Sequence, residues 1–255
     1  MVFYFTGTGN SLYVARQLEE KPLSIPQVMR GDSFDFTDES IGVVAPIYGH
    51  ELPPMVKEFI RKSSFHTDYF YVILTYGLRH GGASELARDF CESCGVHVAY
   101  ANIVLMGDNF LPGYDMEIEQ KADKHVDEQL APIVGDVRGR VHKISAVTEE
   151  DREIHRENVA RNAARPEGEL QHLIVVVADR CIGCGICTRV CPTASMRLVD
   201  GKAEHIPGKC EICMACAQAC PQLAITTSRP EKNPHARYRN EHVTLEDIIE
   251  ANCQF

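Results

Sequence analysis

Eight cysteines in the last third of the chain form two copies of one pattern, C-x2-C-x2-C-x3-C followed by proline. The first copy is Cys181, Cys184, Cys187 and Cys191, and the second is Cys210, Cys213, Cys216 and Cys220. Three thiolates at this spacing can bind one face of an iron–sulfur cube, while the cysteine before proline reaches the neighbouring cube. We therefore expect two [4Fe–4S] clusters with crossed ligands. Cys181, Cys184, Cys187 and Cys220 would hold the first, and Cys210, Cys213, Cys216 and Cys191 the second.

Zinc and disulfide bonds are the competing interpretations of closely spaced cysteines. Structural zinc uses four ligands arranged as two pairs, which differs from three close cysteines plus a Cys-Pro, repeated. The pattern therefore favours iron–sulfur clusters. Cys91 and Cys94 form a further C-x2-C, but they fall near the end of an expected helix, where packing is the better explanation.

From about residue 173 to 228 the repeat resembles the bacterial-type two-cluster ferredoxins. The resemblance implies a small α+β domain, which we place at residues 171–228, and it implies redox partner proteins. Loops of this kind leave little apolar core, so we expect the domain to depend on its clusters for folding.

Continuous apolar runs alternate with amphipathic segments in the first two thirds of the chain. The expected strands are 2–5, 23–28, 41–47, 69–75 and 96–105, and the expected helices include 10–19, 83–94 and 115–130. Apolar strands between helices indicate a parallel sheet covered on both faces. We predict an α/β fold with a doubly wound sheet of five strands in the order 2-1-3-4-5.

Ligands of such a sheet bind beyond the carboxyl ends of its strands. The loop after the first strand, Thr6-Gly7-Thr8-Gly9-Asn10-Ser11, lacks the Gly-Lys-Ser/Thr of a P-loop and the third glycine of a dinucleotide fingerprint. Its hydroxyls, its amide and the N–H groups of a helix N-terminus suit a terminal phosphate. The same residues also serve as an ordinary helix cap.

Two further loops at this edge, Pro46–Pro54 and Thr75–Gly82, pair aromatic residues with glycines. An aromatic face to stack on and a close backbone suit a flat ring. With the first loop they resemble the flavodoxin family over about residues 1–147, which implies bound FMN. By that resemblance the phosphate is held by Thr6, Thr8, Gly9, Asn10 and Ser11, and the ring loops contribute Pro46, Tyr48, Gly49, Thr75, Tyr76, Gly77 and Gly82. A flavodoxin-like domain without flavin is the alternative.

The remaining segments connect or follow these domains. Residues 148–170 are expected to form an exposed, charge-dense helix and then a linker at Arg165–Gly168. Residues 229–255 form a C-terminal tail with a short helix that begins after Thr244, where Asp247 completes a capping box. Asp108–Pro112 lies at the same edge as the three loops, and we assign it no role.

The formal net charge of −10 makes nucleic acid and anionic lipid poor partners. No apolar run approaches membrane-spanning length, and the chain starts with an apparent strand rather than a signal peptide. Because thiolate-held clusters need a reducing compartment, we expect the cytoplasm and surroundings low in oxygen.

The combination resembles the flavodoxin–ferredoxin fusion proteins of anaerobic bacteria and archaea. The resemblance implies an electron carrier in which FMN converts between two-electron and one-electron steps and the clusters relay single electrons. A flavin-dependent reductase of a small substrate, fed by the clusters, is one alternative, and a redox or oxygen sensor is another. No residue is assigned a catalytic role, and a carrier is favoured over an enzyme with its own substrate.

Overall fold

The computed structural model describes all 255 residues, which divide into two compact units. The first unit comprises Met1–Phe5, Asn10–Met106 and Asp123–Ala164, and the second comprises Thr6–Gly9, Gly107–Ala122 and Arg165–Phe255. Neither unit is continuous along the chain, whereas the domains expected from the sequence are. The second unit takes in two loops that the sequence pattern places in the N-terminal domain.

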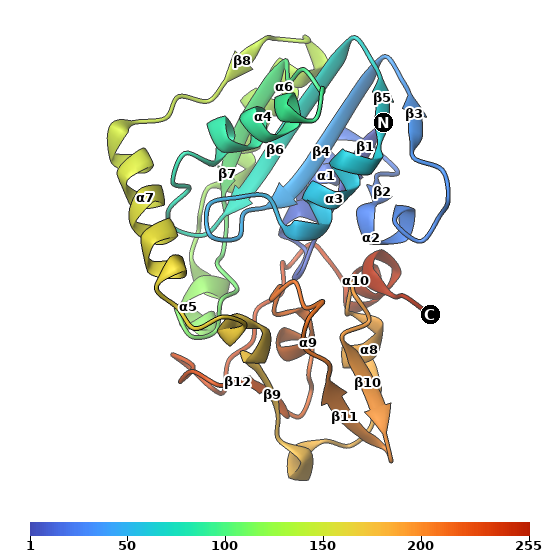
Figure 1. Ribbon diagram of the computed structural model, residues 1–255, viewed down its shortest axis with the longest axis vertical. Coiled ribbons are helices and arrows are strands. Elements are labelled where there is room, and N and C mark those ends of the chain that lie inside the picture. The colour runs from blue at the N-terminus through green and yellow to red at the C-terminus, as the bar shows by residue number, and fades with distance from the viewer. The chain divides into compact units, whose positions relative to one another are not determined.

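The first unit is built on a parallel sheet of six strands in the order β2-β1-β4-β6-β7-β8 (Figure 1). The strands are β1 Val2–Tyr4, β2 Leu23–Ser24, β4 Ser40–Pro46, β6 Tyr69–Tyr76, β7 Tyr100–Leu105 and β8 Lys143–Ile144. The central pair β4 and β6 runs in register from Ser40 opposite Tyr69 to Pro46 opposite Thr75. Both strands are almost wholly buried, which is why their sequences are continuous apolar runs.

The expectation of five strands is wrong, because β8 adds a sixth at the edge beside β7. The expected strand 23–28 is also wrong beyond Ser24, where the chain turns into the short helix α2 Ile25–Val28. The Ser24 hydroxyl accepts a hydrogen bond from the Gln27 N–H, and Pro26 stands in the first turn, where its ring favours a helix start. The last expected strand, 96–105, begins only at Tyr100.

Helices connect the strands of the sheet and pack on it (Figure 1). They are α1 Asn10–Leu18, α3 Pro54–Lys62, α4 Ala83–Ser93 and α6 Val126–Arg138, whereas α7 Glu149–Ala163 follows β8, the last strand of the sheet, and has no buried residue. The single helix expected over 115–130 is wrong, because the chain forms α5 Met116–Lys121 and then restarts as α6. Between them His125 adopts a left-handed φ of 50°, which an α-helix cannot contain.

An aromatic cluster gives the first unit a core of its own. The Phe3 ring of β1 lies 4.7 Å from Phe36 and 4.9 Å from Phe59 of α3, measured between ring centroids. Phe36 and Phe65 belong to a separate pair of short parallel strands, β3 Asp35–Thr37 and β5 Ser64–His66. Aromatic rings at these separations contribute packing beyond simple area burial.

The second unit is small and mixed, with two antiparallel strand pairs and short helices. Its strands are β9 Ile174–Val176 with β12 Ile225–Thr227, and β10 Met196–Val199 with β11 Lys202–His205. Its helices are α5 Met116–Lys121, α8 Ile186–Arg189, α9 Ala215–Gln218 and α10 Leu245–Asn252, together with the 3-10 turns Glu169–His172 and Ala178–Arg180. The capping box of Thr244 and Asp247 at the start of α10 forms as the sequence indicates.

The two copies of the cysteine motif fold alike. Left-handed backbone occurs at Gly183, Gly185 and Ala194 in the first copy and at the equivalent Ile212, Met214 and Leu223 in the second. α8 follows Gly185 directly and α9 follows Met214. Cysteines of both copies belong to one buried cluster with Leu173, Ile225 and other apolar residues. No helix of the chain has the length and apolar content needed to cross a bilayer.

Candidate iron–sulfur site

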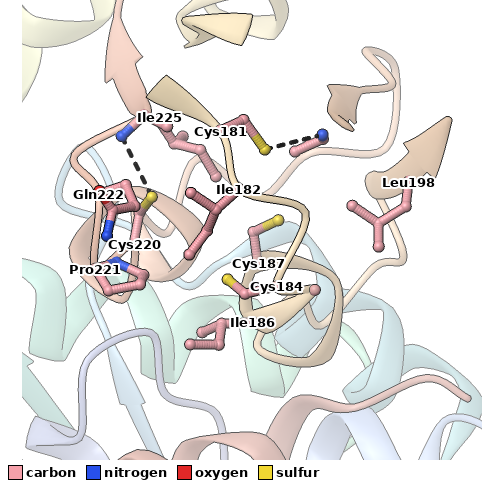
Figure 2. A pocket seen from close by; sticks show the side chains of 13 residues that line it. Cys181, Ile182, Cys184, Ile186, Cys187, Leu198, Cys220, Pro221, Gln222 and Ile225 are labelled. Carbon is pink, nitrogen blue, oxygen red and sulfur yellow. Dashed lines mark hydrogen bonds between the residues drawn. The ribbon is translucent and has the colours of Figure 1, made fainter. Parts of the chain in front are cut away.

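One cavity of the second unit is lined by four cysteines that come from both copies of the motif. They are Cys181, Cys184, Cys187 and Cys220, the set that the spacing predicts for the first cluster. Figure 2 shows these side chains around a common space, with three sulfur atoms from the first copy and one from the second. Ile182, Ile186 and Ile225 supply apolar lining. The cavity is therefore lined by cysteine sulfur atoms on the one hand and by apolar side chains on the other.

Backbone N–H groups point at sulfur atoms in both copies. Ala203 N–H donates to Cys181 Sγ and Ala224 N–H to Cys220 Sγ, both at 3.3 Å (Figure 2). In the second set Ser195 N–H lies 3.1 Å from Cys191 Sγ, and Ile212 N–H lies 3.4 Å from Cys210 Sγ. Such bonds favour the thiolate over the thiol, and the N–H groups of Ala203 and Gly183 lower the pKa of Cys181.

The remaining four cysteines, Cys191, Cys210, Cys213 and Cys216, influence one another electrostatically. Burial raises the pKa of the Cys213 and Cys216 thiols well above the usual range, and negative charge at Cys191 and Cys210 raises it further. Cys191 and Cys216 belong to one buried cluster against which Cys210 packs, and the assignment of all four cysteines to one iron–sulfur cluster stays a prediction. Binding a metal cluster would displace these thiol protons.

The two sets differ in exposure. Cys184 is exposed and the neighbouring Ile182 is 64% exposed, whereas Cys213 and Cys216 are only 7% and 8% exposed. The first set therefore reaches the surface of its unit, and the second lies deeper. Outside both sets, Cys91 is fully buried in α4 and burial raises its pKa to about 12, as expected for a packing residue.

The predicted phosphate loop is enclosed by protein. Thr6, Thr8 and Ser11 are between 1% and 5% exposed. The Gly9 N–H donates to Thr6 Oγ1 at 3.0 Å, and the hydroxyls of Ser11 and Thr75 hydrogen bond at 2.9 Å. A phosphate needs N–H and hydroxyl donors that face accessible space. The Gly9 N–H already donates to Thr6 within the loop, and the hydroxyls of Thr6, Thr8 and Ser11 are buried, so the loop does not fit a phosphate as it stands.

The predicted ring loops begin where β4 and β6 end, and α7 contacts both of them. Asn158 Nδ2 of α7 donates to Gly49 O at 3.0 Å, and the His155 ring lies 5.8 Å from that of His50. Beside the second loop, the imidazole of His80 pairs with Asp151 at 3.2 Å. The sequence predicts α7 correctly as a helix but gives no sign that it covers these loops. α7 thus contacts both loops, and the flavin stays an unsupported prediction.

The repeated cysteine motif, together with a cavity lined by four of its cysteines, is typical of iron–sulfur proteins of the two-cluster class. Residues 173–221 match the family described as a 4Fe-4S dicluster domain. The chain is 38% identical over 55 residues to a ferredoxin of Thermococcus litoralis, a match that covers 93% of that ferredoxin and 21% of this chain. The chain therefore belongs to the ferredoxin family through this part of its sequence.

Two further relatives match over parts of the chain. The putative electron transport protein YsaA of Escherichia coli is 34% identical over 76 residues, which is 28% of this chain and 48% of that protein. A component of the ion-translocating oxidoreductase complex of Methanosarcina acetivorans is 44% identical over 45 residues, which is 18% of this chain and 17% of that protein. The chain thus spans about half of the first relative and less than a fifth of the second.

Proposed function

We propose that the chain is an electron carrier that holds two [4Fe–4S] clusters and exchanges single electrons with redox partner proteins. The observation that carries this proposal is the convergence of Cys181, Cys184, Cys187 and Cys220, from both copies of the motif, on one cavity. The similarity to a ferredoxin and to a putative electron transport protein supports it. We assign Cys191, Cys210, Cys213 and Cys216 to the second cluster.

When bound, each cluster takes up and releases one electron. The residues of the chain provide the thiolates, donate N–H groups to Cys181 and Cys220, and exclude water with apolar side chains such as Ile186. Because Cys184 is exposed and Cys216 is buried, we propose that partners approach the first set.

The sequence also suggests FMN in series with the clusters, and a reductase that would act through that flavin. The enclosed loop around Thr6 and Thr8 does not fit a flavin phosphate, and the proposed carrier role does not require FMN. No observation favours the sensor alternative. The carrier proposal therefore rests on the cysteine-bearing unit alone.

Metal and sulfide analysis of anaerobically purified protein tests the proposal directly. We expect about eight iron and about eight sulfide per chain, because each cluster contributes four of each. One or two zinc ions per chain without sulfide would contradict the cluster assignment and would indicate that the cysteines bind structural zinc.

Serine substitutions test the crossed ligand sets. We expect Cys184→Ser and Cys220→Ser to alter the same cluster signal in electron paramagnetic resonance, although these cysteines stand in different copies of the motif. Cys191→Ser should alter the other signal. Cys94→Ser, which lies outside both sets, is the matched control and should leave about eight iron in place. If Cys184→Ser and Cys191→Ser changed one signal and Cys220→Ser the other, the sets would not be crossed.

A further inference from the structure

The loop Thr6–Gly9 belongs to the cysteine-bearing unit, although it directly follows the first strand of the sheet. We call it the support loop. Its carbonyl oxygens accept hydrogen bonds from segments far along the chain. Thr6 O accepts from Asn252 Nδ2 at 3.0 Å, and Thr8 O accepts from the Asn240 N–H at 2.9 Å. The support loop is therefore tied to the C-terminal tail of its unit.

The glycines of the support loop allow close approach to a cluster ligand. A Cβ placed on Gly7 would lie 2.5 Å from the carbonyl oxygen of Cys213 and 3.3 Å from its Cβ. A Cβ on Gly9, whose φ is 104°, would lie 2.9 Å from the Cβ of Val243. No larger residue fits at Gly7 without moving the backbone of Cys213. The space beside the support loop thus holds the ligand loop of the second set.

Asn109 links the support loop to the same ligand. Its Nδ2 donates to Thr8 Oγ1 at 3.0 Å and to Cys213 O at 3.3 Å. Its own backbone carbonyl accepts from Gln218 Nε2 at 2.7 Å. Gln218 lies between the ligands Cys216 and Cys220 and is only 8% exposed. One amide side chain therefore joins the support loop to the segment that carries cluster ligands.

Asn252 makes an equivalent link to a second ligand segment. It is fully buried, and its Nδ2 donates both to Thr6 O and to Val190 O, the latter at 3.3 Å. Val190 immediately precedes Cys191, a ligand of the same proposed cluster as Cys213. Two amides, at Asn109 and Asn252, thus hold the backbone at Cys213 and at the residue before Cys191, which are both assigned to one set.

We propose that the support loop, with Asn109 and Asn252, positions the ligands of the second cluster and sets its reduction potential, in place of binding a flavin phosphate. The inference rests on the proposed function. Groups that orient ligands and the peptide dipoles around them shift the potential of an iron–sulfur centre. Asn109 and Asn252 are positioning residues, because they act on Cys213 and on the segment before Cys191.

Isosteric changes in the full-length protein, purified without oxygen, test the inference. Asn109→Asp keeps the side-chain shape, removes the donor to Cys213 O and adds a negative charge. We expect it to move one of the two cluster signals to a more negative potential in a titration followed by electron paramagnetic resonance. Thr8→Val keeps the volume and removes the acceptor of Asn109, and we expect a smaller change in the same signal. If the Asn109→Asp variant does not fold, the Thr8→Val variant still tests whether the hydrogen bond between Thr8 and Asn109 affects the potential.

Asn158→Asp is the matched control, because Asn158 also donates to a backbone carbonyl but lies in the sheet unit. We expect it to leave both potentials unchanged. Wild-type protein should contain no stoichiometric flavin and should not quench the fluorescence of added FMN.

Two results would overturn the inference while leaving the carrier proposal intact. One is unchanged potentials in both Asn109→Asp and Thr8→Val at full iron content, and the other is wild-type protein that binds one FMN per chain. A wild-type iron content far below about eight would instead reject the carrier proposal, and the inference with it.

Discussion

The site depends on two kinds of residue. Cysteines can be recognised in the sequence by their spacing, whereas the amides around them can be recognised only from their hydrogen bonds in the structure. Cluster geometry constrains the spacing of cysteines, so the dicluster motif could be recognised from the chain alone. Asn109, Gln218 and Asn252 form hydrogen bonds around the same ligands, yet an isolated amide has no characteristic spacing. The residue types of the support loop suit a phosphate, a helix cap and a close backbone contact equally well, so they do not reveal which one forms.

The surroundings of His50 disfavour its protonated ring, so we expect this residue to make the stability of the folded chain depend on pH. Its φ is 75°, and its ring occupies the space where a Cβ of Gly81 would lie 2.4 Å away. Burial lowers the pKa of His50 below its ordinary value of 6.5, and positive charge at His155 and His80 lowers it further. Arg161 and Arg79 act in the same direction. The folded state therefore prefers the neutral imidazole.

Below about pH 6.5 the unfolded chain binds a proton at His50 that the folded chain resists. We therefore expect the stability contributed by neutral His50 to be complete above this pH and to fall as the pH drops below it. His50→Asn should reduce this pH dependence, because asparagine tolerates the left-handed backbone and does not titrate. Thermal unfolding between about pH 5 and 8 measures the effect. An identical pH slope in the variant would contradict the assignment.

Among the secondary-structure elements, long apolar runs predict the buried central strands reliably, whereas a short edge strand leaves no such pattern in the sequence. β4 and β6 are buried on both faces, and a strand buried on both faces requires a continuous run of apolar residues. β8 has two residues, one of them exposed, and leaves no such run. The break before α6 depends on the backbone of His125, a residue type that does not by itself mark a helix end. Tertiary contacts decide both features.

Gly42 of β4 gives the prediction for this scale. A Cβ there would lie 2.2 Å from the ring of Tyr71 on the neighbouring strand β6, and Tyr71 is only 3% exposed. Because the buried ring has no room to move, Gly42→Ala should lower the free energy of unfolding by about 1–3 kcal/mol. Denaturant unfolding of the full chain measures this change.

Gly135→Ala is the matched control for Gly42→Ala. Gly135 lies inside α6, and a Cβ there would contact nothing within 4 Å. Alanine should therefore raise the free energy of unfolding by about 0.5–1 kcal/mol, since it is the better helix former. If both variants were equally stabilised, the Tyr71 ring would have to move aside for the added methyl group.

At the scale of the whole molecule, the chain passes repeatedly between its two units. The cysteine-bearing unit recruits Thr6–Gly9 and Gly107–Ala122, which follow strands of the sheet unit. A domain boundary predicted from the sequence assigns both segments to the first domain, because their sequences do not indicate the long-range contacts that they make within the second unit. The cluster motif could thus be located from sequence, whereas the extent of its folding unit could not.

The last prediction concerns what happens to these recruited segments when the clusters are removed. The core of the second unit includes the proposed ligands Cys187, Cys191 and Cys216, so we expect it to loosen in an anaerobic chelator. The sheet unit has its own aromatic core and should persist. Amide hydrogen exchange should therefore rise together, by about tenfold or more, in Thr6–Gly9, Gly107–Ala122 and Arg165–Phe255.

The internal control for this experiment is the sheet itself, where amides of β4 and β6 should keep their protection after chelation. Exchange resolved to single amides is needed, because Thr6–Gly9 closely follows β1 and would otherwise be averaged with it. If this loop stayed protected while Arg165–Phe255 opened, it would belong energetically to the sheet and could not act as the support of a cluster. If it opens with the cysteines, its stability is coupled to that of the ligands it contacts, since cluster binding and folding then share one free energy.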